Sequence, residues 1–292
     1  MDRKHEKAML DMQRLLKTQN FNNIEEAQAF MNKHLVGQKI PSFDKEALTP
    51  QEQAQDLVYQ AIETDDIMES DKLVFMALQL DPDCAEAFEY LGDLAGTPMA
   101  SMFLYKNGYT AARKRLGEKF FKENKGHFWG IHETRPFMRC LKNYAECLYT
   151  LDQKESAISN FFELLTLNPN DNQGIRDQAG LYCLELGKID SFEKLCQEYG
   201  EDPTAFHHFN NALCEFIKFG DAVISRTALA KAREINKHVL QLMLTKKELP
   251  QVPDHYSLGD KNEAVFYCVL AKDVWHAVPN AIAWLDAIYN KR

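Results

Sequence analysis

The stretch LKNYAECLYTLDQKESAISNFFELLTLNPN, residues 141–170, carries the pattern of two consecutive helices followed by a proline turn. Its apolar and small side chains recur mostly at three- and four-residue intervals, and the set is Leu141, Tyr144, Ala145, Leu148, Ala157, Phe161 and Leu164, with Pro169 in the turn. Ala145 and Ala157 are small at the two positions where paired helices cross, so the two backbones can approach closely. The stretch therefore predicts a pair of antiparallel, packed helices.

This pattern returns along the chain with a period close to that of a helix pair. Prolines recur at intervals of 32 to 34 residues in two series, Pro50 and Pro82, then Pro136, Pro169 and Pro203. The position of Ala157 is filled by other small residues in the neighbouring units, namely Ser70, Ser191 and Ser225. Such a period is typical of helical repeat proteins. A helical bundle with accidental proline spacing is the alternative, and it does not explain why the prolines and the small residues agree.

Other helical segments interrupt and flank this array. The 54 residues from Pro82 to Pro136 exceed one repeat, and the surplus contains a basic helix predicted over residues 98–124. Residues 3–17 and 23–35 predict two short helices, followed by a linker at 36–50. We expect an N-terminal helical cap at 1–45, a repeat array at 46–247 with an irregular insertion at about 98–135, and C-terminal capping helices at 248–292 that bury the last repeat.

Composition limits the classes of function. The chain is 45% hydrophobic and 26% charged, which is ordinary for a globular protein, and its net charge of −9 argues against a general nucleic-acid binder. Acidic residues gather at 63–93 and basic residues at 106–125, and we expect the two groups to neutralise each other in part. Seven cysteines without C-x-x-C spacing, and no long apolar run, indicate a cytoplasmic protein with reduced thiols and no membrane partner.

The repeats resemble tetratricopeptide repeats over about residues 50–237. More narrowly, GHFWGIHETRPFMR at 126–139 and the closing run NEAVFYCVLAKDVWHAVPNAIAWL at 262–285 are similar to a group of bacterial tetratricopeptide proteins, distantly similar to the suppressor of tumorigenicity 7 family. The resemblance implies an all-α α-solenoid, a superhelix of antiparallel helix pairs with helical caps. It implies a scaffold that binds peptides or partner proteins in a concave groove, and it supplies no biochemical activity.

In such repeats the first helix of each pair lines the groove. By register, the groove residues expected here are Arg139, Lys142, Asn143, Arg176, Asp177, His207, Asn210 and Asn211. The amides and acids among them could hold the backbone of a ligand. Arg139, Lys142 and Arg176 could add charge-assisted bonds to an acidic side chain or a C-terminal carboxylate. The competing interpretation is a solvated polar face without a ligand.

The stretch 126–139 also suggests chemistry, because it combines two histidines with an acid and two arginines. His127, His132 and Glu133 lack the H-E-x-x-H spacing of a zinc site, and the chain contains neither a glycine-rich phosphate loop nor a G-x-S-x-G nucleophile turn. No metal or cofactor is therefore expected.

A structural role accounts for the same stretch. Thr134 is expected to cap the following helix, with Arg135 and Pro136 in its first turn. We expect a seam between the insertion and the regular repeats, built by His127, Trp129, Glu133, Arg135 and Pro136.

The leading hypothesis is a noncatalytic scaffold that binds a protein or peptide segment, acidic or C-terminal, in its groove. Two other functions stay open at this point. One is a regulatory or sensor protein in transcription or signalling, although residues 1–35 make direct DNA contact improbable. The other, less favoured, is a metal-dependent hydrolase that uses the cluster at 127–133.

Overall fold

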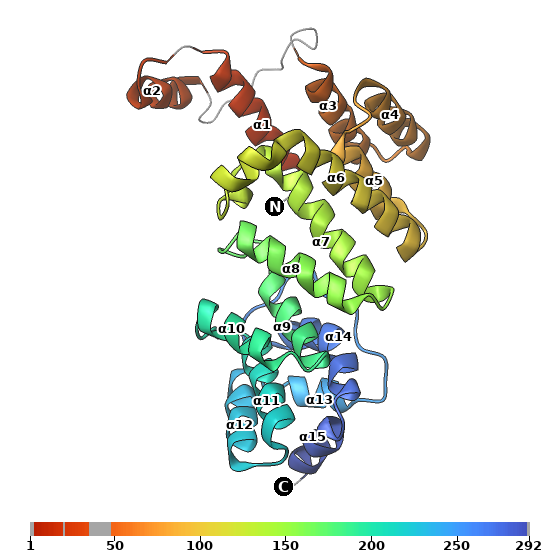
Figure 1. Ribbon diagram of the computed structural model, residues 1–292, viewed down its shortest axis with the longest axis vertical. Helices are drawn as coiled ribbons and strands as arrows, with labels where there is room; N and C mark the ends of the chain where they lie inside the picture. Colours follow the sequence, from red (N-terminus) through yellow and green to blue (C-terminus); the bar gives the residue numbers. More distant parts are fainter. Residues whose placement is uncertain (1–2, 20, 35–47, 291–292) are drawn as a thin grey trace. The chain divides into compact units, whose positions relative to one another are not determined.

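The computed structural model describes residues 3–19, 21–34 and 48–290, and every regular element within them is helical (Figure 1). The predicted all-α class is confirmed for this part of the chain. Most of the predicted linker at 36–50 lies outside the described residues. No helix in the described ranges is both long and apolar enough to span a membrane. The chain divides into two compact units, residues 1–169 and 170–292.

The first unit begins with two short helices that match the predicted segments, α1 (Arg3–Lys17) and α2 (Ile24–His34). The helices that follow are α3 (Pro50–Glu63), α4 (Ile67–Leu80), α5 (Ala85–Leu94), α6 (Pro98–Glu123), α7 (Arg135–Thr150) and α8 (Lys154–Leu167). Two 3-10 turns, η2 (Phe128–Gly130) and η3 (His132–Thr134), connect α6 to α7. Helix α3 packs on α4 and α7 on α8, as the repeat pattern predicts, and α3, α5 and α7 are neighbours.

Small residues permit the close crossings of this unit. A side chain on Gly108 of α6 would lie 2.6 Å from the Cys140 sulfur of α7 and 3.2 Å from Cβ of Phe88 in α5. A side chain on Gly92 would overlap the ring of Tyr105, at 2.5 Å. The crossings of α5, α6 and α7 therefore depend on glycine at these two positions.

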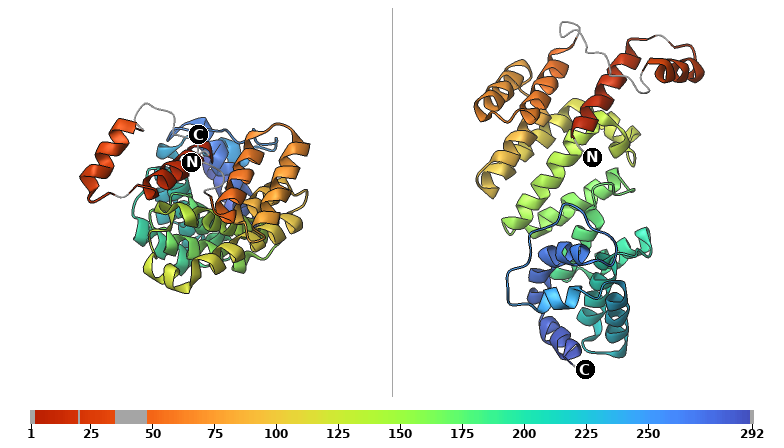
Figure 2. Two further views of the ribbon diagram at one scale, coloured as in Figure 1. Left: turned by 90° about the horizontal axis from the view of Figure 1, so that it is seen from above. Right: turned by 180° about the vertical axis from the view of Figure 1, so that it is seen from behind.

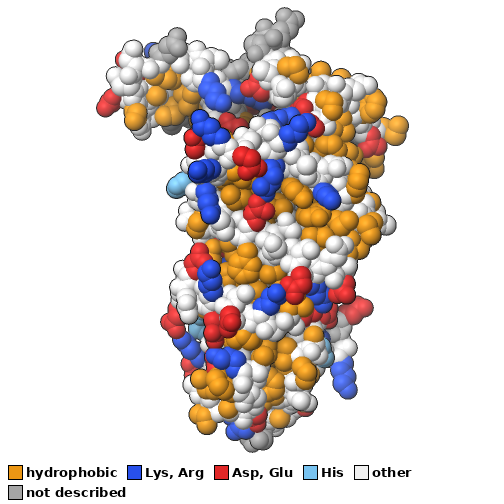
Figure 3. Space-filling view, viewed as in Figure 1, with side chains coloured by type: hydrophobic (Ala, Val, Ile, Leu, Met, Phe, Trp, Pro, Cys, Tyr) orange, Lys and Arg blue, Asp and Glu red, His pale blue; other side chains and the backbone are white. Residues whose placement is uncertain are grey.

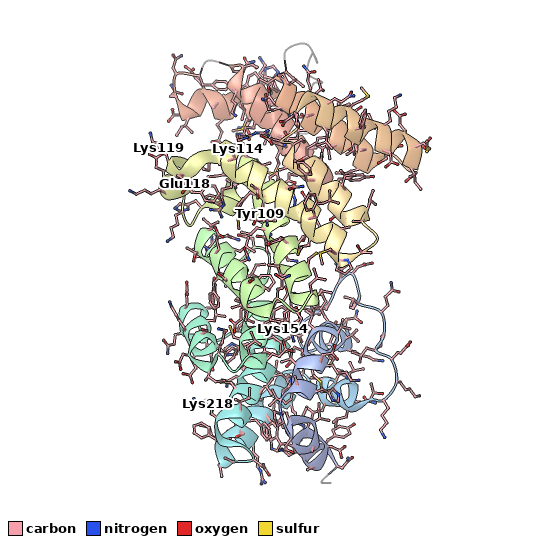
Figure 4. All side chains as sticks on the ribbon, turned by 45° about the vertical axis from the view of Figure 1, so that its right-hand side comes forward. Tyr109, Lys114, Glu118, Lys119, Lys154 and Lys218 are labelled. Atoms are coloured by element: carbon pink, nitrogen blue, oxygen red, sulfur yellow. The ribbon has the colours of Figure 1, made fainter. Side chains whose placement is uncertain are left out.

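The basic helix predicted over residues 98–124 is confirmed as α6. It is interrupted at Gly117, which adopts a positive φ of 75° that few other residues tolerate. Lys114, Glu118 and Lys119 project outward from its second half, while Tyr109 packs against α7 (Figure 4).

The acidic stretch at 63–93 and α6 neutralise each other in part, as expected. Arg115 pairs with Asp81 at 2.7 Å, and Lys114 pairs with Asp83 at 3.2 Å. On the face shown in Figure 3, basic and acidic side chains likewise lie interleaved over the first unit.

The second unit contains α9 (Ile175–Glu185), α10 (Ile189–Tyr199), α11 (Ala205–Phe219), α12 (Val223–Ile235), α13 (Val239–Leu244), α14 (Lys261–Ala277) and α15 (Ala281–Tyr289). Helix α9 packs on α10 and α11 on α12, and α9 is a neighbour of α11. Helix α14 packs against α13 and α15 and also lies against α9 and α11. The C-terminal helices thus cover the first helices of two predicted repeats, and not only the end of the last one.

Candidate functional site

Helix α1 lies beside α3 of the first unit and contacts the first turns of α7 (Figure 2). At one end of the contact, Arg14 of α1 donates from Nη1 to Asp56 Oδ1 at 2.8 Å and from Nη2 to Gln55 Oε1 at 3.2 Å. Asp56 and Gln55 belong to α3, the first helix of its predicted pair.

At the other end of the contact, Glu6 of α1 meets two arginines of α7. Its carboxylate accepts from Arg139 Nη1 at 2.7 Å and from Arg135 Nη1 at 3.4 Å. Arg139 also donates from Nε to both carboxylate oxygens of Glu89 in α5, at 2.7 and 2.9 Å. The predicted groove residue Arg139 is therefore held in an ion-pair network that includes a residue of the chain's own N-terminal helix.

We call the residues of this contact the α1-binding face, and they are Gln55, Asp56, Glu89, Arg135 and Arg139. Burial alone would lower the pKa of Arg139, but the carboxylates of Glu89 and Glu6 raise it above the usual value. Arg139 is consequently a permanent positive charge at one end of the face, and Asp56 provides a negative charge at the other. The face has two poles of opposite charge.

Helix α1 reaches this face through a single stripe. Glu6, Leu10 and Arg14 retain only 4%, 8% and 8% of their exposed area, and their spacing places them on one side of a helix. This stripe was not among the features predicted from the sequence. The signal was present in the spacing, but two of its three members are charged, and charged side chains are seldom buried unless they are paired.

The stretch 126–139 also contacts α1. Glu133 accepts from Gln13 Nε2 at 3.1 Å and from Lys17 Nζ at 3.5 Å. Arg135 donates from Nε to the Trp129 carbonyl at 3.1 Å, and its guanidinium carbon lies 5.5 Å from the centre of the Trp129 ring. Pro136 is in the first turn of α7, and His127 is exposed.

Thr134 precedes α7, as predicted, but the expected side-chain cap is wrong. Its hydroxyl donates to the carbonyls of Ile131, at 2.8 Å, and Phe128, and no side-chain cap is formed. The reason is that the preceding residues already turn as η3, which leaves the Thr134 backbone in a helical and not an extended conformation. Phe128 is fully buried and packs on Phe121, 4.8 Å between ring centres.

The histidines of this stretch gather no further metal ligands. Within the described residues no group of three or more histidine, cysteine, aspartate or glutamate side chains could hold a metal ion. His132 is half-buried, and burial followed by the Arg135 charge lowers its pKa.

Further along α7, Lys142 and Asn143 lie outside the α1-binding face. Lys142 pairs with Glu146 one turn later, at 2.5 Å. Asn143 and Glu146 line a cavity of about 390 Å³ together with Tyr105, whose hydroxyl donates to Asp93 at 2.8 Å. This part of the predicted groove is a polar hollow between α7 and the start of α6.

In the second unit, the structure brings four of the predicted groove residues to one cavity of about 40 Å³. They are Arg176 and Asp177 of α9, and His207 and Asn210 of α11. Residues of α10 and of the connection after it complete the lining. Asn211 is half-buried on α11 and is not part of this lining.

Charges surround this second-unit cavity. The Arg176 guanidinium pairs with Asp202 and lies 5.3 Å from the centre of the Tyr199 ring. Burial raises the pKa of Asp177 from its usual 3.8 to about 7, while Arg176 opposes that shift. Burial also lowers the pKa of His207. The cavity therefore holds an acid whose pKa is raised to about 7 and a histidine whose pKa is lowered.

Asn210 has a structural partner of its own. It is buried, and its carbonyl oxygen accepts from the Tyr267 hydroxyl of α14 at 3.2 Å. The same hydroxyl accepts from Trp275 Nε1 at 2.8 Å. The side-chain amide that the repeat register assigns to a ligand is thus bonded to the C-terminal helices.

The chain matches no known family model, no protein of curated function and no solved structure. The resemblance to tetratricopeptide proteins stays a prediction.

Proposed function

We propose that this chain is a noncatalytic scaffold, a tetratricopeptide-like superhelix of helix pairs that binds a protein or peptide segment along its first helices. Two rows of neighbouring first helices support the superhelix, α3–α5–α7 in one unit and α9–α11 in the other. One observation supports the binding function: residues selected from the repeat register alone lie together in the structure. Arg139 meets one bound helix, and four others line one cavity.

The charges indicate how a carboxylate of the ligand would bind. Each basic residue expected to select it already holds a carboxylate of this chain. Arg139 holds Glu6 and Glu89, Lys142 holds Glu146, and Arg176 holds Asp202. An incoming carboxylate would take the place of one of these groups, so that the charge of the arginine stays compensated.

Buried thiols favour a reducing compartment. Cys84, Cys140 and Cys268 are buried, and burial raises their thiol pKa values, which makes them poor nucleophiles. Free, buried thiols suit a protein of the cytoplasm, where thiols stay reduced. We propose that location on this ground.

Selection of peptides on the full chain tests the proposed function. A displayed library of short peptides would be panned against the wild type and against two variants of the first helices, Asn143→Ala and Asp177→Asn. Two matched variants on second helices, Asn160→Ala of α8 and Asp190→Asn of α10, serve as controls. We expect the wild type and both controls to enrich the same peptides, and at least one of the first-helix variants to lose them. Equal enrichment by all five proteins, or none by the wild type, contradicts the proposal.

A further inference from the structure

We propose that α1 is an internal ligand of the α1-binding face and that a partner helix with the same contact pattern displaces it. The partner is a basic amphipathic helix that carries an acid, a leucine and an arginine at i, i+4 and i+8, the positions of Glu6, Leu10 and Arg14. This inference rests on the proposed function, because it names the occupant of the same first-helix surface.

The chemistry of this partner follows from the charges of the face. Residues 3–17 contain five lysines or arginines and two acids, so α1 is a basic helix. It lies beside Glu52, Asp56 and Glu133, which accept its basic side chains. At the pole formed by Arg135 and Arg139 the helix presents an acid, Glu6. A basic helix with one correctly placed acid therefore complements the whole face.

The two poles also fix the direction of the bound helix. Glu6, near the start of α1, meets the arginines of α7, and Arg14, two turns later, meets Asp56 of α3. A helix bound in the reverse direction would place its arginine against Arg139 and its acid against Asp56. Repulsion at both poles excludes that orientation.

The contact is of a kind that can be exchanged. Among the described side chains of α1, Leu10 is the one hydrophobic group that is buried, with 8% of its area exposed, and the others are half-buried or exposed. The next helix, α2, has no buried residue. The attachment includes ion pairs and hydrogen bonds, which another helix with the same groups can replace one for one.

An attached segment competes strongly with a free one. Because it belongs to the same chain as the face, its binding is intramolecular and does not weaken on dilution. The apparent affinity of a free helix for the wild type is therefore its intrinsic affinity multiplied by the fraction of molecules in which α1 has left the face. Weakening α1 within the chain, without altering the face, should restore the affinity.

A synthetic peptide of residues 1–19, labelled with fluorescein, tests this inference by fluorescence anisotropy. Three full-length chains are compared. They are the wild type, a variant with Glu6→Ala and Arg14→Ala in its own α1, and that variant with Asp56→Asn added on the face. We expect the second chain to bind the peptide at least tenfold more tightly than the wild type. We expect the third to lose most of that gain. A peptide carrying Glu6→Ala should bind the second chain at least tenfold more weakly than the unmodified peptide.

The inference is overturned if the wild type and the second chain bind the peptide equally, if neither binds it, or if Asp56→Asn has no effect. Light scattering provides a further measurement. A wild-type dimer that dissociates in the second chain would show that α1 comes from a second copy, which also overturns internal binding. Circular dichroism establishes that the variants keep their helices. The anisotropy experiment could fail while the wild type still selects peptides that the first-helix variants lose. That outcome would overturn the internal ligand and leave the proposed function standing.

Discussion

Replacing Glu6 with alanine should release α1 from the first unit while the rest of that unit stays folded. The substitution removes a 2.7 Å ion pair with Arg139 and a weaker one, at 3.4 Å, with Arg135. Breaking a buried ion pair costs about 3–5 kcal/mol when the remaining charge is left alone. Arg139 keeps both hydrogen bonds to Glu89, so its charge remains compensated. The loss is then closer to that of one charged hydrogen bond, about 2 kcal/mol.

A loss of about 2 kcal/mol shifts the equilibrium between bound and released α1 by roughly 30-fold. Hydrogen exchange measured by mass spectrometry reports this shift directly, because local opening sets the exchange rate of protected amides. The amides of α1 should exchange roughly 30-fold faster in Glu6→Ala than in the wild type. Those of α7 and α8 should be unchanged.

The variant Lys17→Ala is the matched control on the same helix. Lys17 keeps 68% of its side-chain area exposed and pairs with Glu133 at 3.5 Å. An exposed pair of this kind contributes up to about 1 kcal/mol, so exchange should rise less than about fivefold. Two results would refute the reasoning. In one, Glu6→Ala accelerates α1 no more than Lys17→Ala does. In the other, protection is lost throughout the first unit, which would make Glu6 part of a core and not of a docking contact.

Three further predictions concern stability, measured by urea unfolding. Because burial raises the pKa of Asp177 to about 7, the folded chain binds that proton more tightly than the unfolded chain, and the stability due to this group falls as the pH rises from about 4 to about 7. Asp177→Asn should therefore be more stable than the wild type at pH 8 by about 1–4 kcal/mol, a range that allows for the 28% exposure of the side chain. This advantage should shrink at pH 5, and an advantage that grows toward low pH would contradict the prediction. Thr134→Val removes a buried hydroxyl that bonds to two carbonyls, and it should lower the free energy of unfolding by about 1–3 kcal/mol. Thr166→Ala, on the exposed side of α8, should lower it by less than about 0.5 kcal/mol. Equal losses would contradict a structural role for the buried Thr134 hydroxyl. Gly108→Ala should cost about 1–3 kcal/mol, because its new methyl group meets the Cys140 sulfur at 2.6 Å, and an unchanged unfolding midpoint would show that the crossing can relax.

The helices of the array were predictable because their signals are local. Prolines mark the turns between pairs, and the residues between them alternate large and small at helical spacing. Ala157 and Ser225, chosen as crossing positions, are both fully buried. Helix α7 begins at Arg135, where the sequence places the first turn. Such patterns need no knowledge of distant partners, since each helix pair buries its own stripe.

The occupants of the first helices were not predictable in this way. Repeat register identifies the side chains that face a ligand, but it does not say whether another part of the chain already lies there. Asn210 was assigned to a ligand and is bonded to Tyr267, 57 residues further along the chain. No sequence pattern singles out Glu6, which is bonded to Arg139, 133 residues away. Pairings at these separations leave no periodic trace in the sequence.

The ion pairs of the α1-binding face determine which helix binds there more than how tightly it binds. Removing Glu6 and Arg139 from water costs several kcal/mol for each ion, and their mutual attraction does little more than offset that cost. An apolar face that met an apolar stripe of the same size would hold a helix at least as firmly, but it would accept other amphipathic helices and either direction. The poles at Asp56 and Arg139 disfavour a helix with the opposite arrangement of charges, because like charges would then meet at both poles. A modest net affinity with a strict charge pattern is what an internal ligand needs if a partner is to replace it.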